Sequence, residues 1–162
     1  MIRQFAVITL ILIFSLDSLG AAAEELPRFS LRALDGRTLR SEQLKDKIVV
    51  LDFWATWCAP CIGEAPGFNK LQEKYASRGV QVIGLAVQSG WASDIKRFAR
   101  KHGMRYTIVV GTDDTVSDFD VIAFPTTYVI APGWKLYKKY SGIYEGKSAE
   151  IERDVEALLK GN

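Results

Sequence analysis

Residues 48–61 read IVVLDFWATWCAPC and contain both cysteines of the chain, Cys58 and Cys61. The first seven residues are almost all apolar, as expected of a strand buried on both faces of a parallel sheet. A helix is predicted to follow, because apolar residues recur every three or four positions from Cys61 to Tyr75. Two thiols so close together, where a strand gives way to a helix, can alternate between a dithiol and a disulfide. The stretch therefore predicts redox chemistry at the end of a central strand.

The same cysteine spacing occurs in zinc sites, which are the alternative to redox chemistry. Tetrahedral zinc needs about four nitrogen, sulfur or oxygen ligands. The chain has no further cysteine and a single histidine, His102, which follows two basic residues at a predicted helix end. We therefore expect no metal and no bound cofactor.

Length and charge limit the remaining possibilities. With 162 residues, the chain is long enough for one ordinary domain with an apolar core. Its 21 Lys and Arg residues and 19 Asp and Glu residues give a net charge of +2. This charge is too small to indicate nucleic acid or an anionic membrane surface as a partner. We expect a monomer that does not bind nucleic acid.

The N-terminal segment has the pattern of a secretory signal. Arg3 precedes a largely apolar stretch over residues 5–16, and three alanines at 21–23 offer a cleavage site. The apolar stretch is shorter than the roughly 20 residues of a membrane-spanning helix. We predict a cleaved signal peptide at 1–23 and one domain at 24–162, with an uncleaved membrane anchor as the alternative. Both place the domain outside the cytoplasm, as a periplasmic or otherwise extracytoplasmic protein.

This location bears on the role of the cysteines. Exported proteins often use disulfides to stabilise the fold, usually between residues far apart in the sequence. A bond between Cys58 and Cys61 would close a loop too short to remove much entropy from the unfolded chain. The pair is therefore better suited to a redox switch than to a structural bond.

Hydrophobic periodicity and turn residues predict alternating strands and helices along the rest of the chain. A hairpin is expected at residues 29–39, with its turn at Asp35 and Gly36, and one helical turn at 41–44. The order of elements favours a mixed sheet with helices on both faces. The predicted strands are 48–54, 80–87, 106–110, 126–130 and 135–141, and the predicted helices are 58–77, 93–102, 115–119 and 148–159.

The two cysteines are expected to have different roles because of their positions in the helix. Cys58 is predicted at the N-terminus, where unpaired N–H groups and the helix dipole favour an anion. The thiolate is the reactive species, so Cys58 is the expected nucleophile. Cys61 lies one turn further in, and it is expected to attack Cys58 in a mixed disulfide and release the product.

Two acidic residues are candidates for proton transfer. Strand alternation would bury Asp52, and a buried carboxyl group tends to hold its proton, which it could exchange with Cys61. The alternative is that Asp52 caps or pairs at the strand end. Glu64 follows Cys61 by three residues and so faces roughly the same side of the helix. It could tune the thiols, or it could simply complement the helix dipole.

These features resemble the thioredoxin superfamily and, within it, the TlpA/ResA group of exported thiol-disulfide oxidoreductases. The similarity of layout extends from about Phe29 to Leu159. The matching segments are residues 51–61, Glu64-Ala65-Pro66 and Phe124-Pro125-Thr126-Thr127-Tyr128.

The resemblance implies an α/β thioredoxin fold, with a mixed central sheet flanked by helices, an N-terminal β-hairpin and a central insert at about residues 87–110. It also implies a cis peptide bond before Pro125, which would lie beside Cys58. The backbone before that proline would then be free to pair with an extended substrate. The residues expected to contact substrate are Trp57, Ala59, Pro60, Phe124 and Pro125.

The resemblance further assigns chemistry to matching positions. Cys58 is implied to be the nucleophile and Cys61 the resolving thiol. Asp52 matches the buried acid of thioredoxins, and Glu64 matches the active-site glutamate of the TlpA/ResA group. The implied activity is reduction of disulfides in exported proteins, such as apocytochrome c, with electrons supplied by a membrane donor.

Other activities are associated with similar folds. A peroxiredoxin carries a threonine three residues before its reactive cysteine, where this chain has Ala55. A copper chaperone of the Sco type has three residues between its cysteines (CxxxC) and a suitably placed histidine. Here only two residues separate Cys58 from Cys61, and His102 lies at a basic helix end. An oxidant that introduces disulfides would use the same pair of cysteines, so the sequence leaves the direction of electron flow open.

Overall fold

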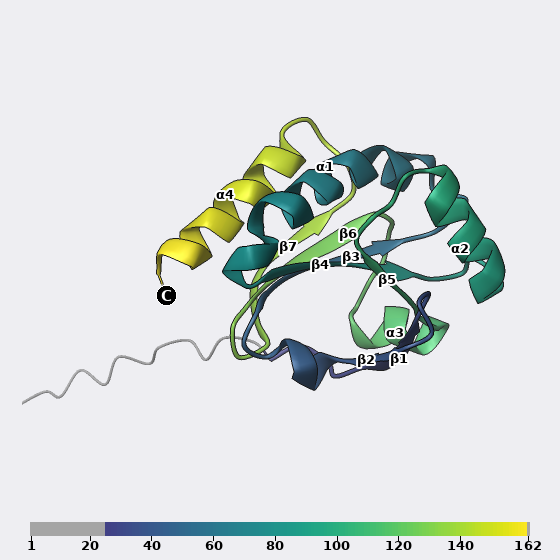
Figure 1. Ribbon diagram of the computed structural model, residues 1–162, viewed down its shortest axis with the longest axis horizontal. Helices are drawn as coiled ribbons and strands as arrows, with labels where there is room; N and C mark the ends of the chain where they lie inside the picture. The colour runs from purple at the N-terminus through teal and green to yellow at the C-terminus, as the bar shows by residue number, and fades with distance from the viewer. Residues whose placement is uncertain (1–24, 162) are drawn as a thin grey trace, which may run out of the picture.

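A mixed sheet of seven strands forms the centre of the protein, whose computed structural model describes residues 25–161 (Figure 1). The strand order is β2-β1-β5-β4-β3-β6-β7. The strands are β1 (Ser30–Ala33), β2 (Thr38–Arg40), β3 (Ile48–Trp54), β4 (Val80–Ala86), β5 (Thr107–Val110), β6 (Thr126–Ala131) and β7 (Lys135–Ser141), and the helices are η1 (Ser41–Leu44), α1 (Ala59–Tyr75), η2 (Ala76–Arg78), α2 (Ala92–Lys101), α3 (Asp113–Asp118) and α4 (Lys147–Lys160).

The apolar run that precedes the cysteines forms the central strand β3. All seven of its residues are buried. It pairs in parallel with β4 and antiparallel with β6. Side chains alternate between the two faces of a strand, so Val50, Asp52 and Trp54 share one face. Val50 and Trp54 belong to the core that also contains Cys58 and Cys61, so Asp52 faces the same side of the sheet as the cysteines.

Helices cover both faces of the sheet, and the N-terminal hairpin at one edge of the sheet curves over one of these faces (Figure 1). Figure 1 shows α1, α2 and α4 on one face, and α3 with the β1–β2 hairpin on the other. Each side has its own apolar core, one containing residues of the three longer helices and the other containing Phe29 and Phe119. The predicted mixed sheet with helices on both faces is confirmed.

The predicted hairpin and insert are both present. Strands β1 and β2 pair antiparallel, and β1 also pairs with β5. The segment expected as a central insert contains α2 and β5, and β5 lies between the hairpin and β4. The insert therefore supplies the strand that connects the hairpin to the rest of the sheet.

The bounds of the four predicted helices differ from the structure by one or two residues, most at the end of α1 and the start of α3. Helix α1 ends at Tyr75 instead of residue 77, and the turn η2 follows before Gly79, which adopts a left-handed conformation. Helix α3 begins at Asp113 instead of residue 115, because the Thr112 side chain caps it by accepting a hydrogen bond from the Thr115 N–H. The predicted signal peptide at 1–23 lies outside the described residues.

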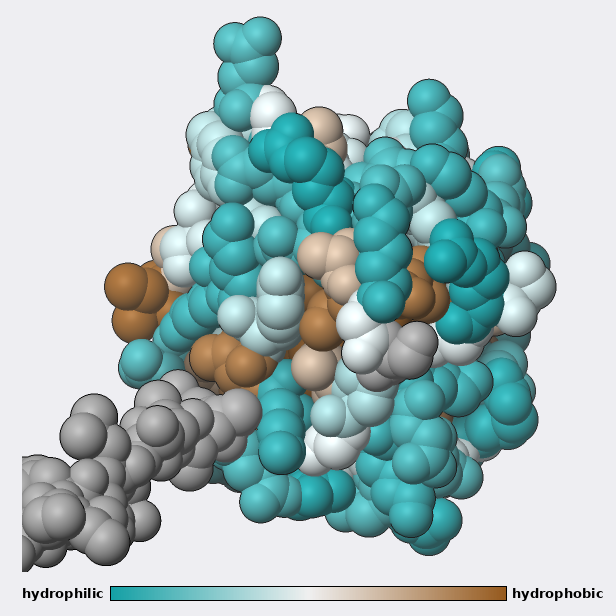
Figure 2. Space-filling view, turned by 90° about the vertical axis from the view of Figure 1, so that its left-hand side faces the viewer, coloured by the Kyte–Doolittle hydropathy of each residue, from teal (hydrophilic) through white to brown (hydrophobic). Residues whose placement is uncertain are grey.

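Figure 2 shows the molecule from the left-hand side of Figure 1, the end at which α4 finishes. This face is mostly hydrophilic, with apolar side chains confined to a limited area, as is usual for a surface in contact with water. Within residues 25–161, the helices are all too short or too polar to cross a membrane.

The position beside Asp52 in the sheet is occupied by Gly84 of β4. An ideal Cβ atom at Gly84 would lie 2.9 Å from Trp54 Nε1 and 2.9 Å from Tyr106 Cε2. The missing side chain therefore leaves room for two aromatic rings of the core that contains the cysteines.

We expect Gly84→Ala to lower the free energy of unfolding by about 1–3 kcal/mol, because the added methyl group overpacks this core. Gly63→Ala is the matched control, since Gly63 is on the exposed side of α1 and its Cβ would meet no atom within 4 Å. This change should raise the free energy of unfolding by up to about 1 kcal/mol. Urea denaturation measures both values, and a loss of similar size in the two variants would contradict this explanation.

Candidate active site

A disulfide bond joins Cys58 and Cys61 at the start of α1. The S–S distance is 2.03 Å and the two Cα atoms are 5.4 Å apart. Cys58 is the N-cap residue, and its Sγ accepts a hydrogen bond of 3.3 Å from the backbone N–H of Cys61. The helix thus points an N–H group at the first sulfur, and the same group can stabilise a thiolate there after reduction.

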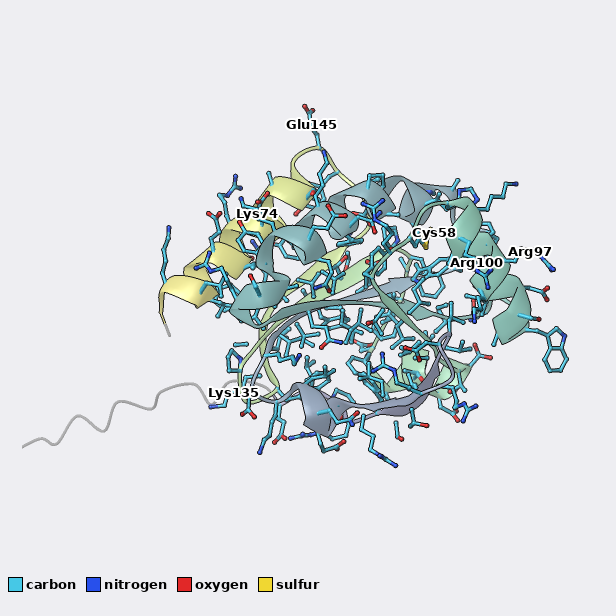
Figure 3. All side chains as sticks on the ribbon, viewed as in Figure 1. Cys58, Lys74, Arg97, Arg100, Lys135 and Glu145 are labelled. Carbon is cyan, nitrogen blue, oxygen red and sulfur yellow. A yellow bond between two sulfur atoms is a disulfide. The ribbon has the colours of Figure 1, made fainter. Side chains whose placement is uncertain are left out.

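The disulfide is largely covered by its surroundings. Cys58 is 5 % exposed and Cys61 is 3 % exposed. Ala59 and Pro60 between them are exposed. Figure 3 shows Cys58 at the beginning of α1, on the same side of the sheet as α2 with Arg97 and Arg100. A substrate must therefore approach the sulfurs at the N-terminal end of α1.

The loop before β6 also borders the N-terminal end of α1, where a substrate must approach. The peptide bond between Phe124 and Pro125 is cis, as predicted. The ring of Phe124 packs edge-on against that of Trp57, with centroids 5.7 Å apart. Trp57 is also fixed by a hydrogen bond of 3.0 Å from its Nε1 to the carbonyl oxygen of Gln88. The structure therefore brings the loop of Phe124 next to the residue that precedes Cys58.

One apolar residue of this region was not predicted. Ile122 is 87 % exposed and lies two residues before Phe124, while Trp57 is 62 % exposed. A single exposed isoleucine has no distinctive sequence signal, because only the folded loop shows that it is not part of the core. Trp57 and Phe124, whose rings are in contact, are called the apolar rim below.

Asp52 is buried, as expected from strand alternation. It is 1 % exposed, and its Oδ1 accepts a hydrogen bond of 2.7 Å from the hydroxyl group of Thr127. Burial, followed by the nearby charge of Glu64, raises the pKa of Asp52 to about 8, although Thr127 and Lys147 act in the opposite direction. This carboxyl group can therefore take up or release a proton near neutral pH.

Glu64 is paired with a lysine that the sequence analysis did not single out. Lys147 Nζ lies 2.9 Å from Glu64 Oε1 and donates a hydrogen bond of 3.1 Å to Oε2. Burial raises the pKa of Glu64, and the hydrogen bond and charge of Lys147 oppose that rise. Glu64 lies beyond the first turn of α1, so the alternative that it simply complements the helix dipole is less well supported than a role in this largely buried ion pair.

The described residues show no cluster of potential metal ligands. Between residues 25 and 161, no three His, Cys, Asp or Glu side chains are grouped as a metal site would require. The side chains gathered on this side of the sheet include two cysteines, two carboxyl groups and one lysine. This set can exchange a disulfide and move protons, which is the chemistry of thiol–disulfide exchange.

Comparison with known proteins agrees with this chemistry. A family model described as the AhpC/TSA family matches residues 22–139. The thioredoxin-like protein YneN of Bacillus subtilis is 30 % identical over 135 residues, which cover 82 % of this chain and 79 % of YneN. The thiol-disulfide oxidoreductase ResA of B. subtilis is 33 % identical over 119 residues, covering 73 % of this chain and 66 % of ResA.

Solved structures with the same fold include a thiol:disulfide interchange protein of the thioredoxin family from Chlorobium tepidum. It is 28 % identical, with a TM-score of 0.75, and the match covers 86 % of this chain and 98 % of that one. The expected thioredoxin fold is therefore confirmed. The chain belongs to the AhpC/TSA family, and it is a thiol-disulfide oxidoreductase whose redox pair is Cys58 and Cys61.

Proposed function

We propose that this oxidoreductase reduces disulfide bonds of exported proteins outside the cytoplasm. The observation that carries the proposal is the Cys58–Cys61 disulfide at the N-cap of α1, next to the exposed apolar rim. The signal-like segment at residues 1–23 supports export. Apocytochrome c and other exported proteins with cysteine pairs are the proposed substrates.

The reaction proceeds through a mixed disulfide. In the reduced protein, the Cys58 thiolate attacks one sulfur of the substrate disulfide, and the other substrate sulfur leaves as a thiolate that takes up a proton. Cys61 then loses its proton and attacks Cys58 Sγ, which releases the second substrate thiol and forms the Cys58–Cys61 disulfide. Two electrons pass to the substrate, and a dithiol donor must return two electrons and two protons.

Asp52 is the proposed acceptor of the Cys61 proton. It faces the same side of β3 as the core that contains both cysteines, and its pKa of about 8 is close to that of a free thiol, ~8.5. A proton can therefore pass between the two groups with little driving force in either direction. Glu64, three residues after Cys61, is proposed to tune this exchange through its charge.

The substrate is proposed to bind in an extended conformation. The ring of Phe124 packs against Trp57, and the backbone of Phe124, just before the cis bond to Pro125, is proposed to pair with a substrate strand, which is a common mode of peptide recognition. The exposed Ala59 and Pro60 and the apolar rim would contact substrate side chains. Backbone pairing does not depend on sequence, so several different substrates can be accepted.

Electrostatics favour the reducing direction. Glu64 is one helical turn from Cys61, and a carboxylate near a sulfur disfavours the thiolate. The carboxylate thus offsets part of the stabilisation that the helix N-terminus gives to the Cys58 thiolate, and a less stabilised thiolate makes the dithiol the better electron donor. We propose that the protein acts as a monomer and receives its electrons from a membrane protein.

The first test concerns the two cysteines. In the reduced protein, iodoacetamide should alkylate Cys58 before Cys61. The pH dependence of Cys58 alkylation should give an apparent pKa below the value of ~8.5 expected for free cysteine. Cys61→Ser should accumulate mixed disulfides with a peptide that contains a disulfide, whereas Cys58→Ser should form none. Faster labelling of Cys61, or turnover of hydrogen peroxide in place of the peptide, would contradict the proposal.

The second test concerns Asp52. Asp52→Asn should slow the collapse of the mixed disulfide by about tenfold or more, because an amide cannot accept the Cys61 proton. In wild-type protein, the folded state holds this proton up to about pH 8, whereas the unfolded state loses it near pH 4. The free energy of unfolding therefore falls between these pH values, by at most about 1.4 kcal/mol per pH unit, and Asp52→Asn should lack this contribution.

Stopped-flow fluorescence from pH 6 to 9 and urea denaturation of the oxidised form from pH 4 to 8 measure the two effects of Asp52→Asn. Unchanged kinetics would remove Asp52 from the mechanism. A stability difference between variant and wild type that stays constant with pH would show that Asp52 is ionised throughout in the folded protein.

A further inference from the structure

Lys147 is in an unfavourable place for a lysine. It is 2 % exposed, and it is the first residue of α4. Burial disfavours a charged ammonium group, and the positive end of the helix dipole repels it. A charged lysine that is both buried and at the N-terminus of a helix needs favourable electrostatic contacts with its neighbours.

The neighbours of Lys147 supply an ion pair and two hydrogen bonds to its ammonium group. In addition to both carboxylate oxygens of Glu64, Nζ donates a hydrogen bond of 3.0 Å to the carbonyl oxygen of Gly142. An ammonium group has three N–H donors, and two of them donate these hydrogen bonds, while Oε1 of Glu64 lies within ion-pair distance. The N–H of Gly142 in turn donates to the carbonyl oxygen of Pro125, at 2.8 Å. Lys147 thereby connects the active-site glutamate to the backbone that supports the Pro125 loop.

A close approach of two helices brings Lys147 to Glu64. Gly67 lies one turn after Glu64 on α1, and an ideal Cβ atom there would be 2.9 Å from Ser148 Oγ. The absence of a side chain at Gly67 lets the first turn of α4 pack against α1. The ion pair thus depends on the packing of helices that are far apart in the sequence.

The charge of Lys147 acts on both acids of the site. It opposes the rise that burial causes in the pKa of Glu64 and, at longer range, in that of Asp52. Tyr106 is the other titratable side chain that senses both acids, and its pKa is raised by burial and then by their charges. The remaining acids at the start of α4 are directed elsewhere. Glu145 points away from the protein in Figure 3, and Glu150 contacts Tyr144 and Lys138.

We propose that Lys147 is a positioning residue of this enzyme, which fixes the carboxylate of Glu64 through their buried ion pair and so adjusts proton exchange at Asp52. This inference rests on the proposed function for its catalytic meaning, because it concerns the proton that Cys61 is proposed to give up. Lys147 does not touch the reacting sulfurs in this role. It acts through the carboxyl groups of Glu64 and Asp52, because its positive charge opposes the effect of burial on both.

Carbon-13 NMR titration of the Asp52 carboxyl group in labelled protein tests the proposal directly. Lys147→Met should move the Asp52 midpoint upward by about one pH unit, because a nearby cation is lost. Glu64→Gln should move it downward, because a nearby anion is lost. The double variant Glu64→Gln/Lys147→Met should return close to the wild-type midpoint, since the two effects oppose each other.

Lys138→Met is the matched control, because it removes a half-exposed lysine that lies 3.6–3.7 Å from acids on α4. It should leave the Asp52 midpoint unchanged. If Lys147→Met fails to fold, the comparison of Glu64→Gln with the double variant isolates the lysine, and the midpoint should be higher in the double variant. An unchanged midpoint in both comparisons would overturn the proposal.

The kinetics of mixed-disulfide collapse separate this inference from the proposed function. At pH 7, Lys147→Met should be about tenfold slower than wild type and should recover as the pH rises, since one pH unit changes the ionised fraction about tenfold. If the Asp52 midpoint moves but the rate does not follow it, the role of Lys147 stands and the catalytic role of Asp52 is wrong. A rate lowered equally at every pH, with no movement of the midpoint, would indicate a purely structural lysine.

Discussion

The carboxyl group of Asp52 is buried at the centre of the sheet, and the other polar groups of the site are arranged around it. A buried carboxylate is costly unless it is protonated or compensated. Thr127 of β6 donates a hydrogen bond to it, and Lys147 of α4 opposes the effect of burial from further away. Asp52 can therefore gain or lose a proton near neutral pH, on the side of the sheet that carries the disulfide.

The fold makes this arrangement possible by bringing distant segments together. Thr127 is 75 residues from Asp52, and Lys147 is 83 residues from Glu64. The pairing of β3 with β6 places Thr127 directly beside Asp52, and the packing of α1 against α4 places Lys147 on Glu64. The short connection from β3 to α1 puts the cysteines at the end of the same strand. The proposed proton transfer and the fold therefore depend on the same contacts.

Features determined by local sequence could be predicted well. The hydrophobic pattern of β3, the capping position of Cys58 and the cis peptide bond before Pro125 depend on neighbouring residues or on a specific motif, and the structure confirms them. Lys147 could not be found in this way. A lysine in a helical segment normally predicts a solvated side chain, and its burial depends on the absence of a side chain at Gly67, on another helix.

The reduction potential of the Cys58–Cys61 couple tests the central claim that this protein donates electrons to its substrates. Equilibration of the purified protein with glutathione or dithiothreitol buffers, followed by alkylation of free thiols, gives this value. A potential below about −200 mV, in the range of thioredoxins and glutaredoxins, is expected for a reductant. A potential near −120 mV, about that of a strong disulfide-forming oxidant, would contradict the account.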